Sequence, residues 1–231
     1  MPADVGAVLV TGGASGLGAA IVAAVAERGG TPLVLDRNPA AREVACEAVD
    51  LADPRAAEAA TGALLGRHGG TLDAVVTAAG VDVPGAFADV SAPDWERVIA
   101  VNLIGTAAVV RAALPALRPG RSRIVTVAST LGFRALGDAT AYCASKFGVV
   151  GFTRALASEL AGEIGVTLLV PGGMRTAFFD GRDEQYRPGD DAQLNDPHDV
   201  AAAVLFALSQ PSGCELRELV MAPATDGSWP P

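Results

Sequence analysis

The chain has 231 residues, a length that fits one large α/β domain more easily than two. Its 17 basic and 26 acidic residues give a net charge of −9, which argues against a surface that binds nucleic-acid phosphates. Half of the residues are hydrophobic, yet no stretch reaches the ~18 to 20 uncharged apolar residues of a membrane span, so we expect neither a nucleic-acid nor a membrane partner.

Short apolar runs alternate with longer segments of helical period, a pattern typical of βα units in a parallel sheet covered on both faces. The predicted strands are Ala7 to Val10, Pro32 to Leu35, Leu72 to Thr77, Arg123 to Val127, Val166 to Val170 and Glu218 to Met221. The predicted helices are Gly16 to Arg28, Pro54 to Arg67, Pro93 to Leu117, Thr140 to Ala161 and Pro197 to Ser209. The segment from Ala40 to Val49 is expected to hold a short helix and a third strand. We therefore expect a single doubly wound α/β domain over residues 1–231.

The longest irregular segment runs from Arg175 to Asn195 and is polar. A loop of this length in a compact domain is usually either a lid over a ligand or a disordered segment, and open parallel sheets bind ligands at the carboxyl ends of their strands. We expect this segment to be a substrate lid.

A glycine-rich turn, Thr11 to Gly18, follows the first predicted strand and runs into an alanine-rich helix. Its glycines permit a tight turn and let a pyrophosphate approach the free N–H groups of the helix, and Ser15 adds a hydroxyl donor. The G-x-x-x-G-x-G spacing differs from the commoner dinucleotide motif and from a P-loop. The pattern alone would also suit a plain tight turn, but its place between strand and helix indicates dinucleotide binding.

Asp36 ends the second predicted strand, 18 residues after Gly18. An acid near this position accepts hydrogen bonds from the adenosine ribose and repels a 2′-phosphate, which favours NAD over NADP. Arg37 is the counter-argument, because an arginine there could hold the phosphate. A purely structural strand-end role for Asp36 is the plainer alternative.

Tyr142 and Lys146 lie four residues apart in a predicted helix, so both project from one face. An ammonium group beside a phenol stabilises the phenolate and makes the tyrosine a usable general base. Lys146 is the only lysine among 17 basic residues, and lysine is not interchangeable with arginine at such sites. An exposed helical pair without function is the alternative.

Two further polar residues stand near these segments. Ser129 closes the strand before Tyr142 and could donate to a substrate oxygen. Asn102 lies within an apolar helix, where by itself it would be a hydrogen-bonded core residue. His198 is interpreted as a first-turn helix residue and not as a catalyst or metal ligand.

In combination, these motifs resemble the short-chain dehydrogenase/reductase family over almost the whole chain. The resemblance implies a Rossmann fold, with Tyr142 as acid/base, Lys146 lowering its pKa and binding the nicotinamide ribose, Ser129 orienting the substrate oxygen and Asn102 supporting a proton-relay water. It implies cofactor contacts at Gly12, Ser15, Gly16, Leu17, Gly18, Asp36, Arg37, Asp50, Leu51, Ala78, Ala79, Gly80, Tyr142, Lys146, Pro171, Gly172, Met174 and Thr176.

The sequence departs from the family pattern at the end of the predicted strand Leu72 to Thr77. Here Thr77-Ala78-Ala79-Gly80 stands in place of the usual Asn-Asn-Ala-Gly. Backbone contacts to a cofactor survive this change, but side-chain hydrogen bonds that brace the strands do not. We expect an effect on stability more than on binding.

The leading hypothesis is an NAD-dependent oxidoreductase that interconverts a secondary alcohol and a ketone on a small, apolar metabolite. An NADPH-dependent 3-oxoacyl thioester or polyketide reductase shares every catalytic residue. An extended sugar-nucleotide epimerase would need a larger C-terminal domain, and a dinucleotide-binding sensor would need no such catalytic set. Apolar residues near the predicted catalytic segment indicate an apolar substrate pocket or simple packing under the lid; they are Leu131, Phe133, Leu136, Phe178 and Phe179. Four arginines could bind an acidic group of the substrate or be solvated; they are Arg134, Arg175, Arg182 and Arg187.

Assembly and location follow by similar reasoning. As in members of the family, we expect a homotetramer or homodimer built on the helices Pro93 to Leu117 and Thr140 to Ala161. The chain has no basic and apolar leader, and Cys46, Cys143 and Cys214 lack disulfide or zinc spacing, so we expect a cytoplasmic protein without a metal. Its richness in alanine, glycine and arginine is typical of a bacterial genome of high GC content.

Overall fold

Seven parallel strands form the central sheet of the computed structural model, which describes residues 5–40 and 44–230. The strands are β1 (Ala7–Thr11), β2 (Thr31–Asp36), β3 (Ala45–Ala48), β4 (Ala74–Thr77), β5 (Arg123–Val127), β6 (Gly165–Pro171) and β7 (Glu218–Met221). Their order is β3-β2-β1-β4-β5-β6-β7, so the chain winds outward from β1 in one direction and returns to β4 to wind in the other. This confirms the predicted doubly wound sheet, and it places a switch point between β1 and β4.

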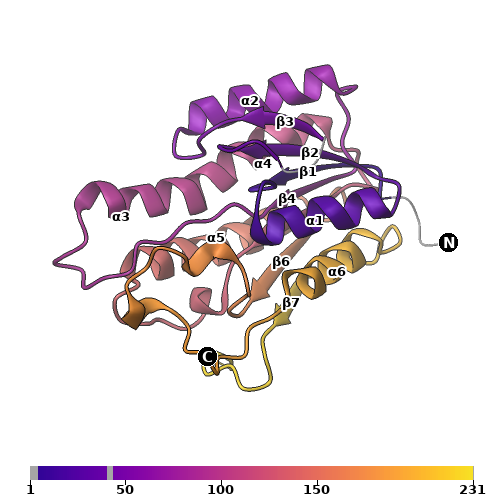
Figure 1. Ribbon diagram of the computed structural model, residues 1–231. Coiled ribbons are helices and arrows are strands. Elements are labelled where there is room, and N and C mark those ends of the chain that lie inside the picture. Colours follow the sequence, from indigo (N-terminus) through magenta and orange to yellow (C-terminus); the bar gives the residue numbers. More distant parts are fainter. Residues whose placement is uncertain (1–4, 41–43, 231) are drawn as a thin grey trace.

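Helices cover both faces of the sheet (Figure 1). On one face, α1 (Gly16–Glu27) and α6 (Pro197–Leu208) pack together over a core rich in valine. On the other face, α2 (Pro54–Arg67), α4 (Thr106–Ala113) and α5 (Thr140–Glu159) close a second core rich in leucine. Because both faces are buried, the inner strands are continuous apolar runs, as the sequence analysis assumed.

The segment Ala40 to Val49 agrees in part with its prediction. It contains the expected third strand as β3, which pairs with β2. The expected short helix would include residues 41–43, which lie outside the described residues, so it stays a prediction.

One long helix contains an irregular turn. It runs through α3 (Ala92–Ile99), a π-helical turn (Ala100–Gly105), α4 and a 3-10 turn (Leu114–Ala116). By length and composition, the helix Ala92–Ala116 of the described chain could cross a membrane, although Arg111 interrupts it. Half of its most apolar part is buried inside the fold, where α4 packs on α2 and β4. That burial is the behaviour of a core helix.

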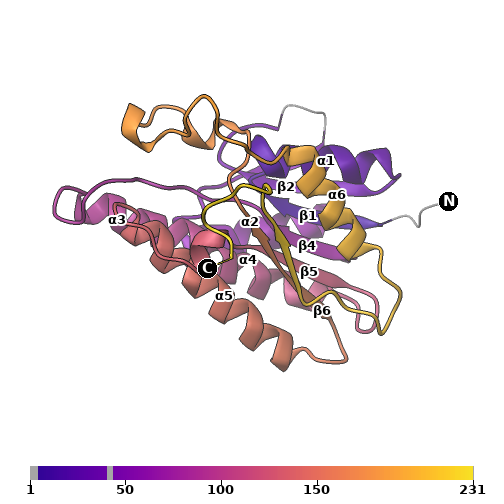
Figure 2. The same ribbon diagram turned by 90° about the horizontal axis from the view of Figure 1, so that it is seen from below.

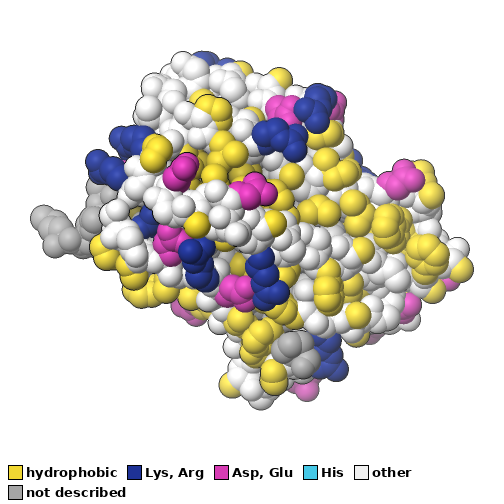
Figure 3. Space-filling view, turned by 180° about the vertical axis from the view of Figure 1, so that it is seen from behind, with side chains coloured by type: hydrophobic (Ala, Val, Ile, Leu, Met, Phe, Trp, Pro, Cys, Tyr) yellow, Lys and Arg dark blue, Asp and Glu magenta, His cyan; other side chains and the backbone are white. Residues whose placement is uncertain are grey.

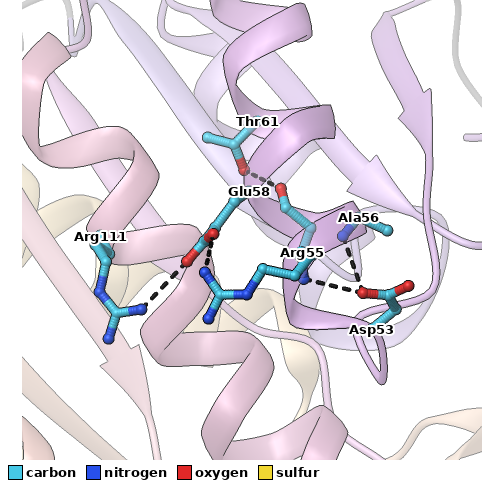
Figure 4. Close-up of polar contacts among 7 residues, drawn as sticks. Asp53, Arg55, Ala56, Glu58, Thr61 and Arg111 are labelled. Carbon is cyan, nitrogen blue, oxygen red and sulfur yellow. Dashed lines mark hydrogen bonds and ion pairs between the residues drawn. The ribbon is translucent and has the colours of Figure 1, made fainter.

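The start of α2 illustrates how local chemistry sets the helix boundaries (Figure 4). Asp53 accepts hydrogen bonds from the amides of Arg55 and Ala56 at 2.9 and 3.0 Å, and proline occupies the first helical position. Glu58 then pairs with Arg55 and, at 3.2 Å, with Arg111 of α4. The cap fixes where α2 begins, and the ion pairs link it to its neighbour.

The predicted lid is irregular in the structure, apart from two short 3-10 turns at Ala177–Phe179 and Glu184–Tyr186. Both ribbon views place it (orange) at the same end of the molecule as α3 (Figure 1 and Figure 2). The lid is attached to the body at several points, including a 3.2 Å hydrogen bond from the Tyr186 hydroxyl to Asp138 and a 2.9 Å bond from the Asn195 amide to the Met221 carbonyl.

Candidate active site

A cleft of about 930 Å³ lies at the carboxyl edge of the sheet, beside the switch point. It is lined by all of the residues predicted to contact a cofactor: Gly12, Ser15, Gly16, Leu17, Gly18, Asp36, Arg37, Asp50, Leu51, Ala78, Ala79, Gly80, Tyr142, Lys146, Pro171, Gly172, Met174 and Thr176. These residues come from the ends of β2 and β6, from the loops after β1, β2, β3, β4 and β6, from the start of α1 and from α5. The fold therefore gathers in one place residues that are far apart in the chain.

The glycine-rich turn is packed so closely that two of its glycines leave no room for a side chain. Gly12 has a φ of +71°, and a Cβ there would lie 2.8 Å from the Cα of Ala79. A Cβ on Gly18 would collide with the carbonyl oxygen of Gly12. Ser15 precedes α1 without using its hydroxyl as a cap, and the first turn of α1 carries no acidic residue. An anion such as a dinucleotide pyrophosphate fits this helix terminus.

Asp36 is buried at the other end of this turn, with 9% of its surface exposed. Its Oδ2 accepts from the Ala14 amide at 3.0 Å and its Oδ1 from the Asn38 amide at 2.9 Å. Each carboxylate oxygen can accept a second hydrogen bond, so the held carboxylate can also receive ribose hydroxyl groups. The neighbouring Arg37 is exposed at the rim of the cleft.

The three polar residues predicted to act on a substrate lie together in the cleft wall. Ser129 follows β5, while Tyr142 and Lys146 lie one turn apart on α5. The Lys146 Nζ donates to the Val127 carbonyl at 3.0 Å and lies 5.5 Å from the centroid of the Tyr142 ring. The Ser129 hydroxyl accepts from the Leu131 amide at 3.2 Å, which leaves its own proton for another acceptor.

The electrostatics of Tyr142 differ from the expectation. Burial raises the pKa of its phenol, and although a hydrogen bond with Ser129 and the charge of Arg182 oppose this shift, the charge of Asp82 adds to it. Burial also lowers the pKa of Lys146 to about 8, against the charge of Asp82. The protein by itself therefore does not lower the tyrosine pKa, because enclosing the phenolate outweighs the favourable groups nearby.

Asn102 lies behind the wall of the cleft and is almost fully buried in the π-helical turn. Its amide oxygen accepts from the Val81 amide at 2.8 Å, and its amide nitrogen donates to the Val81 carbonyl at 2.9 Å and to Ser145 at 3.0 Å. The side chain is thus occupied in holding the loop after β4. A part in a proton relay stays a prediction.

The segment that departs from the family's asparagine pattern, Thr77 to Gly80, contains one unpaired buried hydroxyl group. Thr77 is buried, and its hydroxyl has no hydrogen-bond partner among the described residues. The Ala79 amide donates to the Thr11 hydroxyl at 3.1 Å, which holds this loop against the end of β1. The loop keeps its place, while one buried polar group is left unpaired.

Apolar residues line the substrate end of the cleft, and they include Leu131, Leu136, Phe178 and Phe179. The ring of Phe178 lies 5.7 Å from the ring of Tyr142, so the lid covers the tyrosine. Phe133, also predicted to line the pocket, instead packs edge-on against Trp229 at 5.8 Å. The C-terminal residues Thr225 to Ser228 complete the wall, which the sequence analysis did not foresee.

A buried ion pair beside the tyrosine was not predicted from the sequence. Asp82 and Arg182 pair at 3.3 Å, with only 6% and 11% of their side chains exposed. The other three arginines considered there, Arg134, Arg175 and Arg187, are exposed. An acid two residues after Gly80, at the carboxyl end of β4, was the signal that could have drawn attention to Asp82.

The chain is similar in sequence and in fold to known short chain dehydrogenases. Residues 6–187 match the family model described as short chain dehydrogenase. An uncharacterized oxidoreductase of Staphylococcus aureus is 32% identical over 227 residues, covering 93% of this chain and 96% of that protein. A D-threitol dehydrogenase of Mycolicibacterium smegmatis is 38% identical over 171 residues, 67% of this chain and 64% of that protein. The crystal structure of a short chain dehydrogenase from Burkholderia cenocepacia in complex with NADP matches with a TM-score of 0.84 and 26% identity, over 96% of this chain and 98% of that chain.

Proposed function

The chain belongs to the short chain dehydrogenase family, and we propose that it is an NAD-dependent oxidoreductase that interconverts a secondary alcohol and a ketone on a small metabolite with an apolar part. The observation that carries this proposal is the meeting of Ser129, Tyr142 and Lys146 at one end of a cleft whose other end holds Asp36. The relative named D-threitol dehydrogenase supports a small alcohol as substrate.

In the oxidation direction, Ser129 donates a hydrogen bond to the substrate oxygen and holds it beside Tyr142. The Tyr142 phenolate takes the proton of the substrate hydroxyl group, while a hydride leaves the carbon that bears this hydroxyl group. When bound, NAD supplies the hydride acceptor and a positive charge on its nicotinamide ring. Lys146, held by the Val127 carbonyl, is placed to bind the nearby ribose, and any positive charge near Tyr142 favours the phenolate.

The second candidate is an NADPH-dependent 3-oxoacyl thioester or polyketide reductase. Arg37 favours it, because this exposed guanidinium lines the cleft next to Asp36 and could meet a 2′-phosphate. The NADP in the Burkholderia structure points the same way. Asp36 opposes it, because its carboxylate would repel that phosphate.

The test measures turnover of a panel of secondary alcohols and ketones by the absorbance of reduced nicotinamide, with NAD and NADP in parallel. We expect alcohol oxidation with at least about a tenfold preference in kcat/KM for NAD. Tyr142→Phe should abolish turnover and leave dinucleotide affinity within severalfold, because the ring remains but the proton carrier is lost. A preference for NADP would favour the reductase, and a turnover by Tyr142→Phe close to that of the parent would remove this tyrosine from the mechanism.

A further inference from the structure

The buried pair of Asp82 and Arg182 carries an inference about the substrate, which rests on the proposed function. We propose that Asp82 and Arg182 form a binding subsite for a second, uncharged hydroxyl group of the substrate, so that the substrate is a small diol or polyol.

The ion pair between Asp82 and Arg182 is incomplete. Arginine and carboxylate groups commonly pair through two parallel hydrogen bonds, but here Nη2 and Oδ2 lie 3.3 Å apart without forming a hydrogen bond. Among the described residues, neither Asp82 Oδ1 nor Arg182 Nη2 has a hydrogen-bond partner, although both atoms are buried. Buried polar atoms without partners are rare, and at a binding site they point to a group that completes them.

The second step is the position of the pair. Both side chains line the same cleft as Ser129 and Tyr142. The guanidinium of Arg182 lies 4.5 Å from the ring centroid of Phe178 and 4.9 Å from that of Phe179, and Phe178 in turn contacts Tyr142. Stacking on two rings fixes the guanidinium. The charges of Asp82 and Arg182 also act on the pKa of the Tyr142 phenol, so the subsite lies near the reacting group.

The third step is the chemistry that matches one free acceptor beside one free donor. A hydroxyl group donates and accepts, so it can pair with Oδ1 and with Nη2 at once. A carboxylate only accepts and would be repelled by Asp82, whereas an ammonium group only donates and would be repelled by Arg182. A methyl group would leave both atoms unpaired. Burial raises the pKa of Asp82, although the charge of Arg182, a hydrogen bond from the Val83 amide and the charge of Lys146 oppose this shift.

The test compares kcat/KM with NAD for four alcohols on one carbon skeleton, which differ only in the group beside the reacting carbon. On three carbons these are propylene glycol, isopropanol, lactate and isopropanolamine, and the same series is made on the best skeleton from the alcohol panel. We expect the hydroxyl compound to be preferred over the methyl compound by on the order of a hundredfold, with both charged compounds poorer still. An equal or better rate with the methyl compound or a charged compound would overturn the proposal. A wild type that turns over no alcohol at all would instead overturn the proposed function.

Variants separate a substrate contact from a latch that merely holds the lid. Asp82→Asn should lower the ratio of kcat/KM for the diol to kcat/KM for the methyl compound by at least about tenfold, a ratio in which any common effect through Tyr142 cancels. The double variant Asp82→Leu with Arg182→Met avoids an unpaired buried charge, and it should fold and lose the preference for the diol. Asp89→Asn changes an exposed acid of the same loop and should alter nothing. If the pair variants lowered all four rates equally, the pair would be a latch and the proposal wrong.

Discussion

Lys146 is buried beside the cleft with its Nζ on the Val127 carbonyl, and this placement makes the stability of the fold depend on pH. Burial lowers its pKa from 10.5 to about 8. Between these values the unfolded chain binds a proton that the folded chain does not, so the free energy of unfolding should rise with pH in this window. The rise should be on the order of 2 to 3 kcal/mol.

Urea unfolding at a series of pH values would measure this effect. Lys146→Met should abolish the rise between about pH 8 and pH 10, because methionine does not titrate. Lys146→Arg is the matched control: its charge persists throughout, so it should be less stable and equally flat. A variant with methionine that kept the full rise would show that another group titrates in this window.

The unpaired hydroxyl of Thr77 predicts an unusual result for a core substitution. Thr77→Val keeps the shape of the side chain and removes a buried polar group without a partner, so stability should rise by up to about 1 kcal/mol. The matched control lies beside it on β5, where Thr126 pairs in register with Thr77 and bonds to Thr153 at 2.6 Å. Thr126→Val should destabilise by about 1 kcal/mol. Equal losses in the two variants, measured by urea unfolding, would mean that the Thr77 hydroxyl is bonded after all.

At the scale of whole elements, replacing a glycine by alanine should change the free energy of unfolding in opposite directions in two helices. Gly18 in α1 faces the Gly12 carbonyl, so Gly18→Ala must displace the turn, which should cost about 1 to 3 kcal/mol and abolish dinucleotide binding. Gly62 in α2 is exposed with open space at its Cβ position, so Gly62→Ala should stabilise by about 0.5 to 1 kcal/mol. Unfolding midpoints and the fluorescence of bound NADH would test both. Normal binding by Gly18→Ala would contradict the close packing of the turn.

The elements that the sequence predicted well have strong local signals. The bounds of α2 and β5 agree with the prediction to the residue, because Asp53-Pro54 caps one and a short apolar run defines the other. The π-helical turn within the long helix was not predicted, since its apolar residues read as continuous helix. Its position depends on Asn102, which bonds to a loop 21 residues away in the chain.

The residues of the candidate site also divide into those with a local sequence signal and those without one. Residues at strand ends, such as Asp36 and Ser129, could be placed from the sequence because parallel strands end at one edge. The pairing of Asp82 with Arg182 joins two loops a hundred residues apart, and no local pattern encodes it. The same holds for the C-terminal wall, where Ser228 bonds to Thr130 at 2.7 Å across the cleft rim.

At the scale of the whole molecule, charge and apolar surface are unevenly distributed. Seen from behind, hydrophobic side chains predominate over the half of the face that lies on the α3 side, and charged groups are few there (Figure 3). Exposed large hydrophobic residues of the described chain include Ile104 in the π-helical turn and Phe147 on α5, with 46% and 44% of their surfaces exposed. The two elements that carry them are in contact, because Leu103 packs directly against Gly148. Such a surface is typical of a subunit interface.

We therefore expect the protein to form a homodimer or homotetramer through the helices that carry these residues. A stable interface of about 1,200 to 2,000 Å² would bury both side chains, and placing a charge in its centre should break it. Light scattering at micromolar concentration should report a dimer or tetramer for the wild type and a smaller species for Phe147→Glu. Phe87→Glu replaces an aromatic residue that is 68% exposed on the loop between β4 and α3, outside the helices themselves, so it should leave assembly unchanged. A monomeric wild type would contradict this prediction and would leave the apolar face without a role in assembly.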